Sequence, residues 1–199
     1  MIIRHFHRRN LPHLYYNEGI YFVTFRLYGS IHPNELKKLQ EEIIKNQSLH
    51  PHEQKKVFKK YDLLLDKAYN DIKYLQQPEI MRICKSALHF YEGKEINLIC
   101  YCIMPNHIHL VFELINKNRL VGDIVGSIKK FIARESNKIL NRKGKFWQSE
   151  SFDRLVRDEI ELYFTIKYVL MNPMNAGLVN DWNEWQEGTF CKPEFKVID

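Results

Sequence analysis

Two histidines separated by one residue are the side chains of this sequence that best fit a metal or catalytic site. His107-Ile108-His109 directly follows Met104-Pro105-Asn106. Because successive side chains of a strand point to opposite faces, His107 and His109 are expected to project from the same face. Two neighbouring imidazoles on a rigid strand can bind a divalent metal ion. The competing interpretation is a pair of hydrogen-bonded core histidines, and the pattern alone leaves both open.

Two other histidine pairs have the same spacing. His5 and His7 lie in the basic N-terminal segment, and His50 and His52 flank a proline in a polar connection. Neither pair lies in an apolar run. The pair at positions 107 and 109 alone is embedded in a predicted core strand, where a site can be preorganised.

A tyrosine in the C-terminal third of the chain could supply a nucleophile. A tyrosine hydroxyl can attack a phosphodiester and keep the phosphoryl group, but a metal ion or a base must assist, since its ordinary pKa is about 10. Tyr168 and Asn172 are four residues apart and therefore share one helix face. The amide oxygen of Asn172 could join the histidines as a ligand. Packing is the alternative role, and spacing alone does not distinguish Tyr168 from Tyr163.

Composition limits the class of protein. The chain has 199 residues, of which 45% are hydrophobic and 27% charged, as in one ordinary globular domain. No apolar run has membrane-spanning length and the first residues lack the apolar core of a signal peptide, so we expect a cytoplasmic protein. The net charge of +6 favours an anionic partner. The cysteines show no C-x-x-C spacing and are expected to be reduced core thiols; they are Cys84, Cys100, Cys102 and Cys191.

The elements that position these residues follow from periodicity. Apolar runs at Ile96–Ile103 and His107–Leu114, separated by a Pro-Asn turn, predict a β-hairpin. The alternating run after Gly19 predicts an earlier strand, and Phe146–Phe152 a short strand or extended segment. Helical spacing predicts the remaining elements: a long region from Pro33, the segment Glu53–Leu75 without any sign of chemistry, Pro78–Tyr91, Arg119–Ile139, and a helix capped by Asp158 and stopped by Pro173.

Basic residues are clustered as well. Lys130, Arg134 and Lys138 repeat every four residues, and further cations precede Phe146-Trp147. Cations beside aromatic side chains suit single-stranded nucleic acid, although a solvated helix face is the alternative. Residues 1–18, which include Arg8 and Arg9, are either a phosphate-binding arm or a mobile terminus.

Several motifs in the same order resemble the REP-associated tyrosine transposases, which are HUH-superfamily relatives of the insertion-sequence transposases with a single catalytic tyrosine. His107-Ile108-His109 after Met-Pro-Asn resembles the His-hydrophobic-His signature of the HUH single-strand DNA endonucleases. The other motifs similar to this group lie at residues 8–13, 21–27, 146–148, 152–154, 157–158 and 168–179.

This resemblance implies a ferredoxin-like α+β fold, with an antiparallel sheet, helices on one face and the histidine pair on a central strand. It implies Tyr168 as the nucleophile, and His107, His109 and Asn172 as ligands of Mg²⁺ or Mn²⁺. It further implies a transposase that cleaves single-stranded DNA near palindromic hairpins through a 5′-phosphotyrosine and can rejoin strands.

The expected organisation is a single domain over residues 1–199, with a basic arm at 1–18, a helical insertion at about 45–78 and a C-terminal tail at 180–199. Its expected partner is single-stranded or hairpin DNA, bound by a monomer or homodimer away from membranes. Phosphate contacts are expected from Arg8, Arg9, Lys130 and Arg134. Two alternatives remain: a hairpin-binding protein without cleavage, and a metallophosphoesterase that uses water and would tolerate loss of Tyr168.

Overall fold

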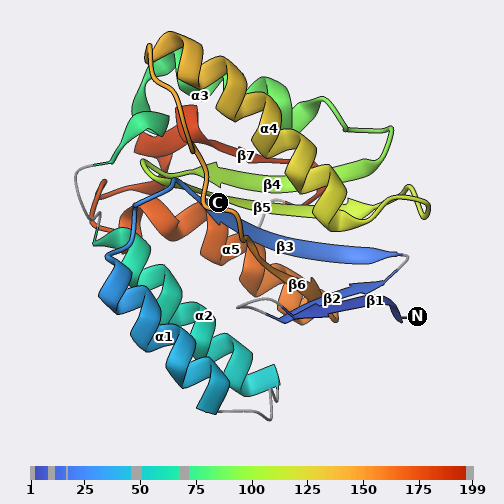
Figure 1. The fold of residues 1–199 in the computed structure, drawn as a ribbon. Coiled ribbons are helices and arrows are strands. Elements are labelled where there is room, and N and C mark those ends of the chain that lie inside the picture. Colours follow the sequence, from blue (N-terminus) through green and yellow to red (C-terminus); the bar gives the residue numbers. More distant parts are fainter. Residues whose placement is uncertain (1–2, 9–11, 17, 46–50, 68–71, 196–199) are drawn as a thin grey trace.

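A five-stranded antiparallel sheet lies at the centre of the protein (Figure 1). The computed structural model describes residues 3–8, 12–16, 18–45, 51–67 and 72–195. The strand order is β6-β3-β5-β4-β7, and β1 and β2 form a separate two-stranded sheet. The strands are β1 Ile3–Arg8, β2 Pro12–Tyr16, β3 Gly19–Arg26, β4 Ile96–Ile103, β5 His107–Leu114, β6 Phe152–Val156 and β7 Thr189–Cys191.

The predicted β-hairpin is confirmed with the predicted bounds. β4 and β5 pair antiparallel, and the amide of Met104 donates to the carbonyl of His107 across the turn (2.9 Å). β5 lies between β3 and β4, with Thr24 opposite His109 and Arg26 opposite His107. The histidine pair therefore lies on the central strand.

The helices form two layers. They are α1 Pro33–Lys45, α2 Pro51–Asp66, α3 Pro78–His89, α4 Val121–Ile139 and α5 Glu159–Asn175. The order β3-α3-β4-β5-α4-β6 is the ferredoxin-like connection, with α3 and α4 on one face. The predicted α+β class is thus confirmed.

One detail of the predicted fold needs correction, because the opposite face of the sheet also carries helices. α5 packs on it together with α1 and α2, which lie between β3 and α3 in the chain (Figure 1). The strands are apolar on both sides: Tyr21 belongs to the core under α3 and α4, and its neighbour Phe22 to the core under α5. A strand that is buried on both faces requires two helical layers.

One predicted extended segment is found, and one predicted helix end is wrong. Within Phe146–Phe152, predicted as a short strand or extended segment, Trp147 forms an isolated antiparallel bridge with Leu27 and Gln148 N donates to Arg26 O (2.9 Å), whereas the regular strand β6 begins at Phe152. α5 passes through Pro173 and ends at Asn175. A proline removes only one amide donor, and the helix still closes with Ala176 N donating to Asn172 O (2.9 Å).

The remaining segments differ in how they relate to the sheet. α2 lies in the predicted insertion and ends at Asp66, well before Leu75. The C-terminal segment adds β7 to the edge of the sheet beside β4. Cys84, Cys100 and Cys102 are buried thiols, as predicted, and Cys191 is half-buried. Among the described residues, no helix combines the length and apolar character needed to cross a membrane.

Candidate functional site

The histidine pair lies within the core, on the face of the sheet that α5 covers. The side chains of His107 and His109 are 1% and 0% exposed, and their Nε2 atoms are 3.0 Å apart. The ring of Phe22 stacks on His109 with centroids 5.7 Å apart. The expectation that both imidazoles project from one face is confirmed.

Each imidazole is held through its Nδ1 atom. Asn106 Nδ2 donates to the carbonyl of Leu65 (2.9 Å), so Asn106 Oδ1 accepts from His107 Nδ1 (2.6 Å). His107 therefore keeps the lone pair on its Nε2 atom. Thr24 Oγ1 lies 2.8 Å from His109 Nδ1. Such contacts to the second ring nitrogen are typical of histidines that bind metals.

The protonation of the pair suits metal binding too. Burial and the neighbouring His109 hold the pKa of His107 well below its ordinary value. Burial lowers the pKa of His109 to about 3. Both imidazoles are therefore neutral at physiological pH, and the neutral form is the one that binds a metal ion.

Asp62 of α2 joins the site, although sequence analysis found no chemistry in this segment. Its Oδ1 lies 3.4 Å from His109 Nε2, and its Oδ2 accepts a hydrogen bond from the Tyr168 hydroxyl. Burial, together with the charge of Asp66, raises the pKa of Asp62 to about 7. The single sequence signal was a pair of carboxylates four residues apart on one helix.

α5 contributes the tyrosine and the asparagine. The ring centroid of Tyr168 is 5.7 Å from that of His109. Asn172 is 1% exposed, and its Nδ2 donates to Asp62 Oδ2 (3.4 Å). Tyr163 is 42% exposed and contacts the ring of Phe164 instead. The structure therefore brings Tyr168, and not Tyr163, to the histidine pair.

These side chains fit a divalent metal ion. Ligand atoms of Asp62, His107 and His109 all lie within 4.8 Å of one another. The buried Oδ1 atoms of Asp62 and Asn172 have no hydrogen-bond partner in the described part of the chain, whereas buried polar atoms normally have one. Imidazole nitrogens combined with carboxylate and amide oxygens suit several divalent ions. Asp62 was absent from the predicted ligand set.

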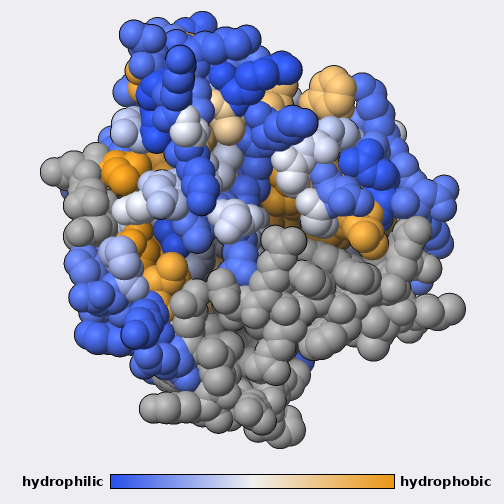
Figure 2. Space-filling model, viewed as in Figure 1, coloured by the Kyte–Doolittle hydropathy of each residue, from blue (hydrophilic) through white to orange (hydrophobic). Residues whose placement is uncertain are grey.

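The predicted phosphate contacts are not brought to this site. Lys130 and Arg134 are exposed on α4, across the sheet from the histidines, and Arg134 pairs with Glu135. Hydrophilic side chains cover most of the surface over α3 and α4 (Figure 2). Arg8 belongs to β1, but its side chain and all of Arg9 lie outside the described residues.

Residues 68–170, just over half of the chain, match the family model described as "Transposase IS200 like". The chain belongs to this transposase family. It is similar to a Haemophilus influenzae protein named as a REP-associated tyrosine transposase, with 25% identity over 101 residues. That match covers 46% of this chain and 57% of the relative, so it spans little more than half of the relative's length.

A solved structure of a REP-associated tyrosine transposase bound to a REP hairpin shares the fold. The TM-score is 0.58 at 14% identity, over 90% of this chain and 79% of the solved chain. The predicted resemblance to this group is confirmed. His107, His109 and Tyr168 fall within the residues that match the family, whereas Asp62 and Asn172 lie outside them.

Proposed function

We propose that this transposase cleaves single-stranded DNA beside palindromic hairpins, with Tyr168 as the nucleophile, and can rejoin the strands. The observation that carries the proposal is the hydrogen bond between the Tyr168 hydroxyl and Asp62, because the same carboxylate lies against His109. Tyr168, Asp62 and the two imidazoles thus meet in one cluster. The DNA class is supported by the related structure, which holds a REP hairpin.

In the proposed reaction, Tyr168 Oη attacks the phosphorus of the scissile phosphodiester and its proton passes to Asp62 Oδ2. The bond from phosphorus to the 3′ oxygen breaks, the phosphoryl group stays on Tyr168 as a 5′-phosphotyrosine, and the 3′ oxygen takes up a proton from water and leaves as a hydroxyl. Attack by a 3′-hydroxyl on this linkage reverses the step and rejoins the strands. Asp62 therefore both orients the tyrosine and receives its proton.

His107, His109 and Asn172 would hold Mg²⁺ or Mn²⁺, with Asp62 as a further oxygen ligand. A bound ion would polarise the scissile phosphate and stabilise the charge that develops on it. Asn106 and Thr24 keep both Nε2 atoms directed to the same point. We also propose that Arg8, Arg9, Lys130 and Arg134 contact phosphates of the DNA outside the site.

The test is a denaturing-gel assay with labelled hairpin single strands, including palindromes from the DNA flanking the gene, in Mn²⁺ or in EDTA. The wild type is compared with Tyr168→Phe, His107→Ala and the matched control Tyr163→Phe. We expect a protein–DNA adduct in Mn²⁺ from the wild type and Tyr163→Phe only. Cleavage by Tyr168→Phe without an adduct would establish water as the nucleophile. Tight binding without cleavage of any substrate would establish a DNA-binding protein.

A further inference from the structure

A cavity of about 840 Å³ lies between α2 and α5 and is lined by both Tyr168 and Asp62. It therefore opens directly beside the proposed nucleophile, whereas the histidines behind it are buried. Its outer part is formed by Lys59 and Leu63 of α2 and by Ile160 and Phe164 of α5. Nothing in the proposed chemistry uses these outer residues.

On the α5 side of this cavity, the side chains of Ile160 and Phe164 form an apolar surface exposed to solvent, which we call the ledge. Ile160, Phe164 and Tyr168 are spaced by four residues and thus share one face of the helix. Ile160 and Phe164 are 72% and 63% exposed, and Leu63 on the α2 side is 53% exposed. Large apolar side chains grouped at the mouth of a cavity are typical of a binding surface.

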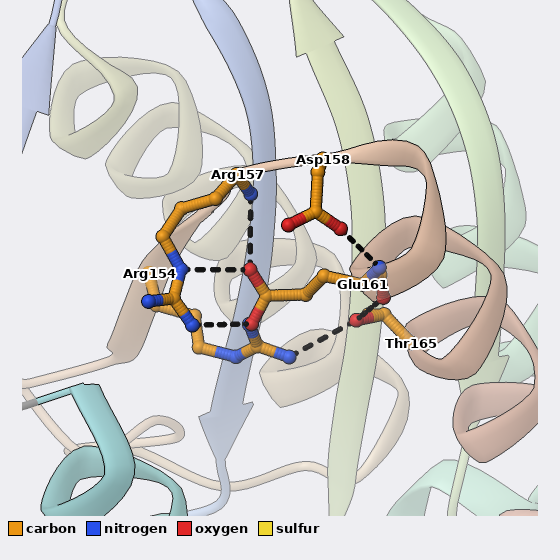
Figure 3. A network of polar contacts seen from close by, with 5 residues as sticks. All are labelled: Arg154, Arg157, Asp158, Glu161 and Thr165. Atoms are coloured by element: carbon orange, nitrogen blue, oxygen red, sulfur yellow. Dashed lines mark hydrogen bonds and ion pairs between the residues drawn. The ribbon is translucent and has the colours of Figure 1, made fainter.

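The remaining wall holds two arginines, Arg154 and Arg157, together with the carboxylates of Asp158 and Glu161. Arg154 Nη1 donates to Glu161 Oε1 (2.6 Å) and Arg157 Nε donates to Glu161 Oε2 (3.0 Å), so two guanidinium groups share one carboxylate (Figure 3). Thr165 accepts a second bond from Arg154 (3.0 Å). The Arg154 side chain is 16% exposed, and that of Arg157 is 47% exposed, leaving the latter at the rim.

The charges at the rim differ from those at the inner end. Lys59 and Arg157 are exposed at the outer part of the cavity, beside one exposed carboxylate, Asp158. The carboxylates on the α2 side, Asp62 and Asp66, lie beside the nucleophile, and burial raises the pKa of Asp66 to about 6. The phosphates of a ligand could therefore contact Lys59 and Arg157 at the rim, and the ligand would lead inward to Tyr168.

We propose that this cavity binds the single-stranded DNA next to the scissile phosphate, an inference that rests on the proposed function. Bases pack on the ledge formed by Ile160 and Phe164, and the phosphates between them contact Lys59 and Arg157. Aromatic ledges beside cations are the usual means of binding single strands without sequence readout. An apolar peptide would not use the cations, and a duplex stem would not expose the bases that the ledge requires.

The test measures DNA binding in EDTA, so that no cleavage is needed. One fluorescent hairpin carries a single-stranded extension and a second is blunt. Phe164→Ala is compared with Phe90→Ala, which truncates an equally exposed phenylalanine (61%) at the end of α3, across the sheet. We expect Phe164→Ala to weaken binding of the extended hairpin about tenfold, as for loss of one stacked base, and to leave the blunt hairpin unchanged. Phe90→Ala should bind both DNAs like the wild type.

A second variant tests the phosphate contact. Lys59→Ala should lower the salt dependence of binding by about one charge, on the extended hairpin only. Equal effects of Phe164→Ala on both hairpins, or no effect on either, would overturn the proposal. So would a change in the solution mass of the protein with unaltered DNA binding, because the ledge would then join two copies of the chain.

The two proposals fail in different ways. DNA binding that depends on the single-stranded extension and on Phe164, without a Tyr168 adduct on any substrate, would contradict the proposed tyrosine chemistry. The same result would support DNA binding by the cavity. A normal adduct, with no contribution of Phe164 or Lys59 to DNA binding, would contradict only the proposal that the cavity binds DNA.

Discussion

At the scale of residues, the histidine pair is defined by what holds each ring. Asn106 fixes the Nδ1 atom of His107 and Thr24 contacts that of His109. Because both Nδ1 atoms are occupied, the Nε2 atoms are the ones that face each other and the carboxylate of Asp62. Two neutral imidazoles directed at one point would preorganise the proposed metal site before any ion binds.

We expect Thr24→Val to weaken metal binding without unfolding the protein. Valine has nearly the shape of threonine but cannot hold His109 Nδ1, so the ring loses its orientation. Loss of such a contact typically lowers metal affinity about 10- to 100-fold. The measurement is calorimetric titration with Mn²⁺, together with a thermal melt.

Thr189→Val in β7, which removes a hydroxyl bonded to Trp185, is the control and should titrate like the wild type. Equal affinities for the wild type and Thr24→Val would contradict this role.

The residues of the site differ in how far the sequence could predict them. The shared face of His107 and His109 follows from strand alternation alone, and Tyr168 from a family motif. Thr24 meets His109 across 85 positions, and Asp62 meets Tyr168 across 106. Those contacts depend on strand register and on the docking of α2, which no local pattern encodes.

At the scale of elements, the Glu161 carboxylate of α5 forms hydrogen bonds with arginines at and just after the end of β6. Glu161 accepts from the side chains of Arg154 and Arg157 and from the amide of Arg157 (3.0 Å). Asp158 caps the same helix by accepting from Glu161 N (2.7 Å). This network therefore sets the direction in which α5 leaves the sheet, and with it the position of Tyr168.

We expect Glu161→Gln to destabilise the protein at pH 7 by about 1–2 kcal/mol, because two arginines lose their shared charge. Burial acts to raise the pKa of Glu161, but hydrogen bonds from Arg157 and the charge of Arg154 prevail and lower it to about 2. A lowered pKa means that the carboxylate stabilises the fold above its ordinary value of 4.5, and that this contribution is lost as the pH falls toward 2.

Urea unfolding at pH 7 and at several pH values below 5 measures this effect. The difference between the wild type and Glu161→Gln should shrink as the pH falls. Glu135→Gln on α4 is the control and should change little, because its ion pairs are exposed to solvent. A difference that stays constant down to the acid limit would show that the carboxylate acts by packing and not by charge.

Helices and strands could be predicted from the sequence where apolar periodicity, turn residues or capping residues determine them. The hairpin of β4 and β5 and the Asp158 cap came directly from apolar runs, a Pro-Asn turn and a capping box. Phe146–Phe152 was predicted as a short strand or extended segment, and Trp147 there forms an isolated bridge with Leu27. Pro173 is a helix stop by local rules, yet α5 continues to Asn175, and Asn172 Nδ2 in this last turn contacts Asp62 of α2 (3.4 Å). A local rule for proline does not include such contacts between elements.

At the scale of the whole molecule, distant segments of the chain converge on one point. β3 supplies Thr24, β5 the histidines, α2 the carboxylate, and α5 the tyrosine and asparagine. The connection between β3 and α3 is long enough to carry α1 and α2 across the sheet, and this is how Asp62 reaches α5 (Figure 1). The proposed site is therefore complete within a single chain.

This completeness leads to a prediction about mixtures of inactive variants. His107→Ala lacks a metal ligand and Tyr168→Phe lacks the nucleophile, so each alone should form no adduct. If two chains exchanged their α5 helices, a mixture would contain sites that combine an intact tyrosine with intact histidines, and activity would return. Within one chain the Tyr168 hydroxyl already donates a hydrogen bond to Asp62, and its ring lies 5.7 Å from that of His109, so no exchange is required.

We therefore expect no adduct from the mixture in Mn²⁺, even after the variants are unfolded and refolded together. Wild type diluted into Tyr168→Phe serves as the control and should form adduct in proportion to the wild type added. An adduct from the mixture, absent from both separate variants, would show that the active unit is a dimer with exchanged helices.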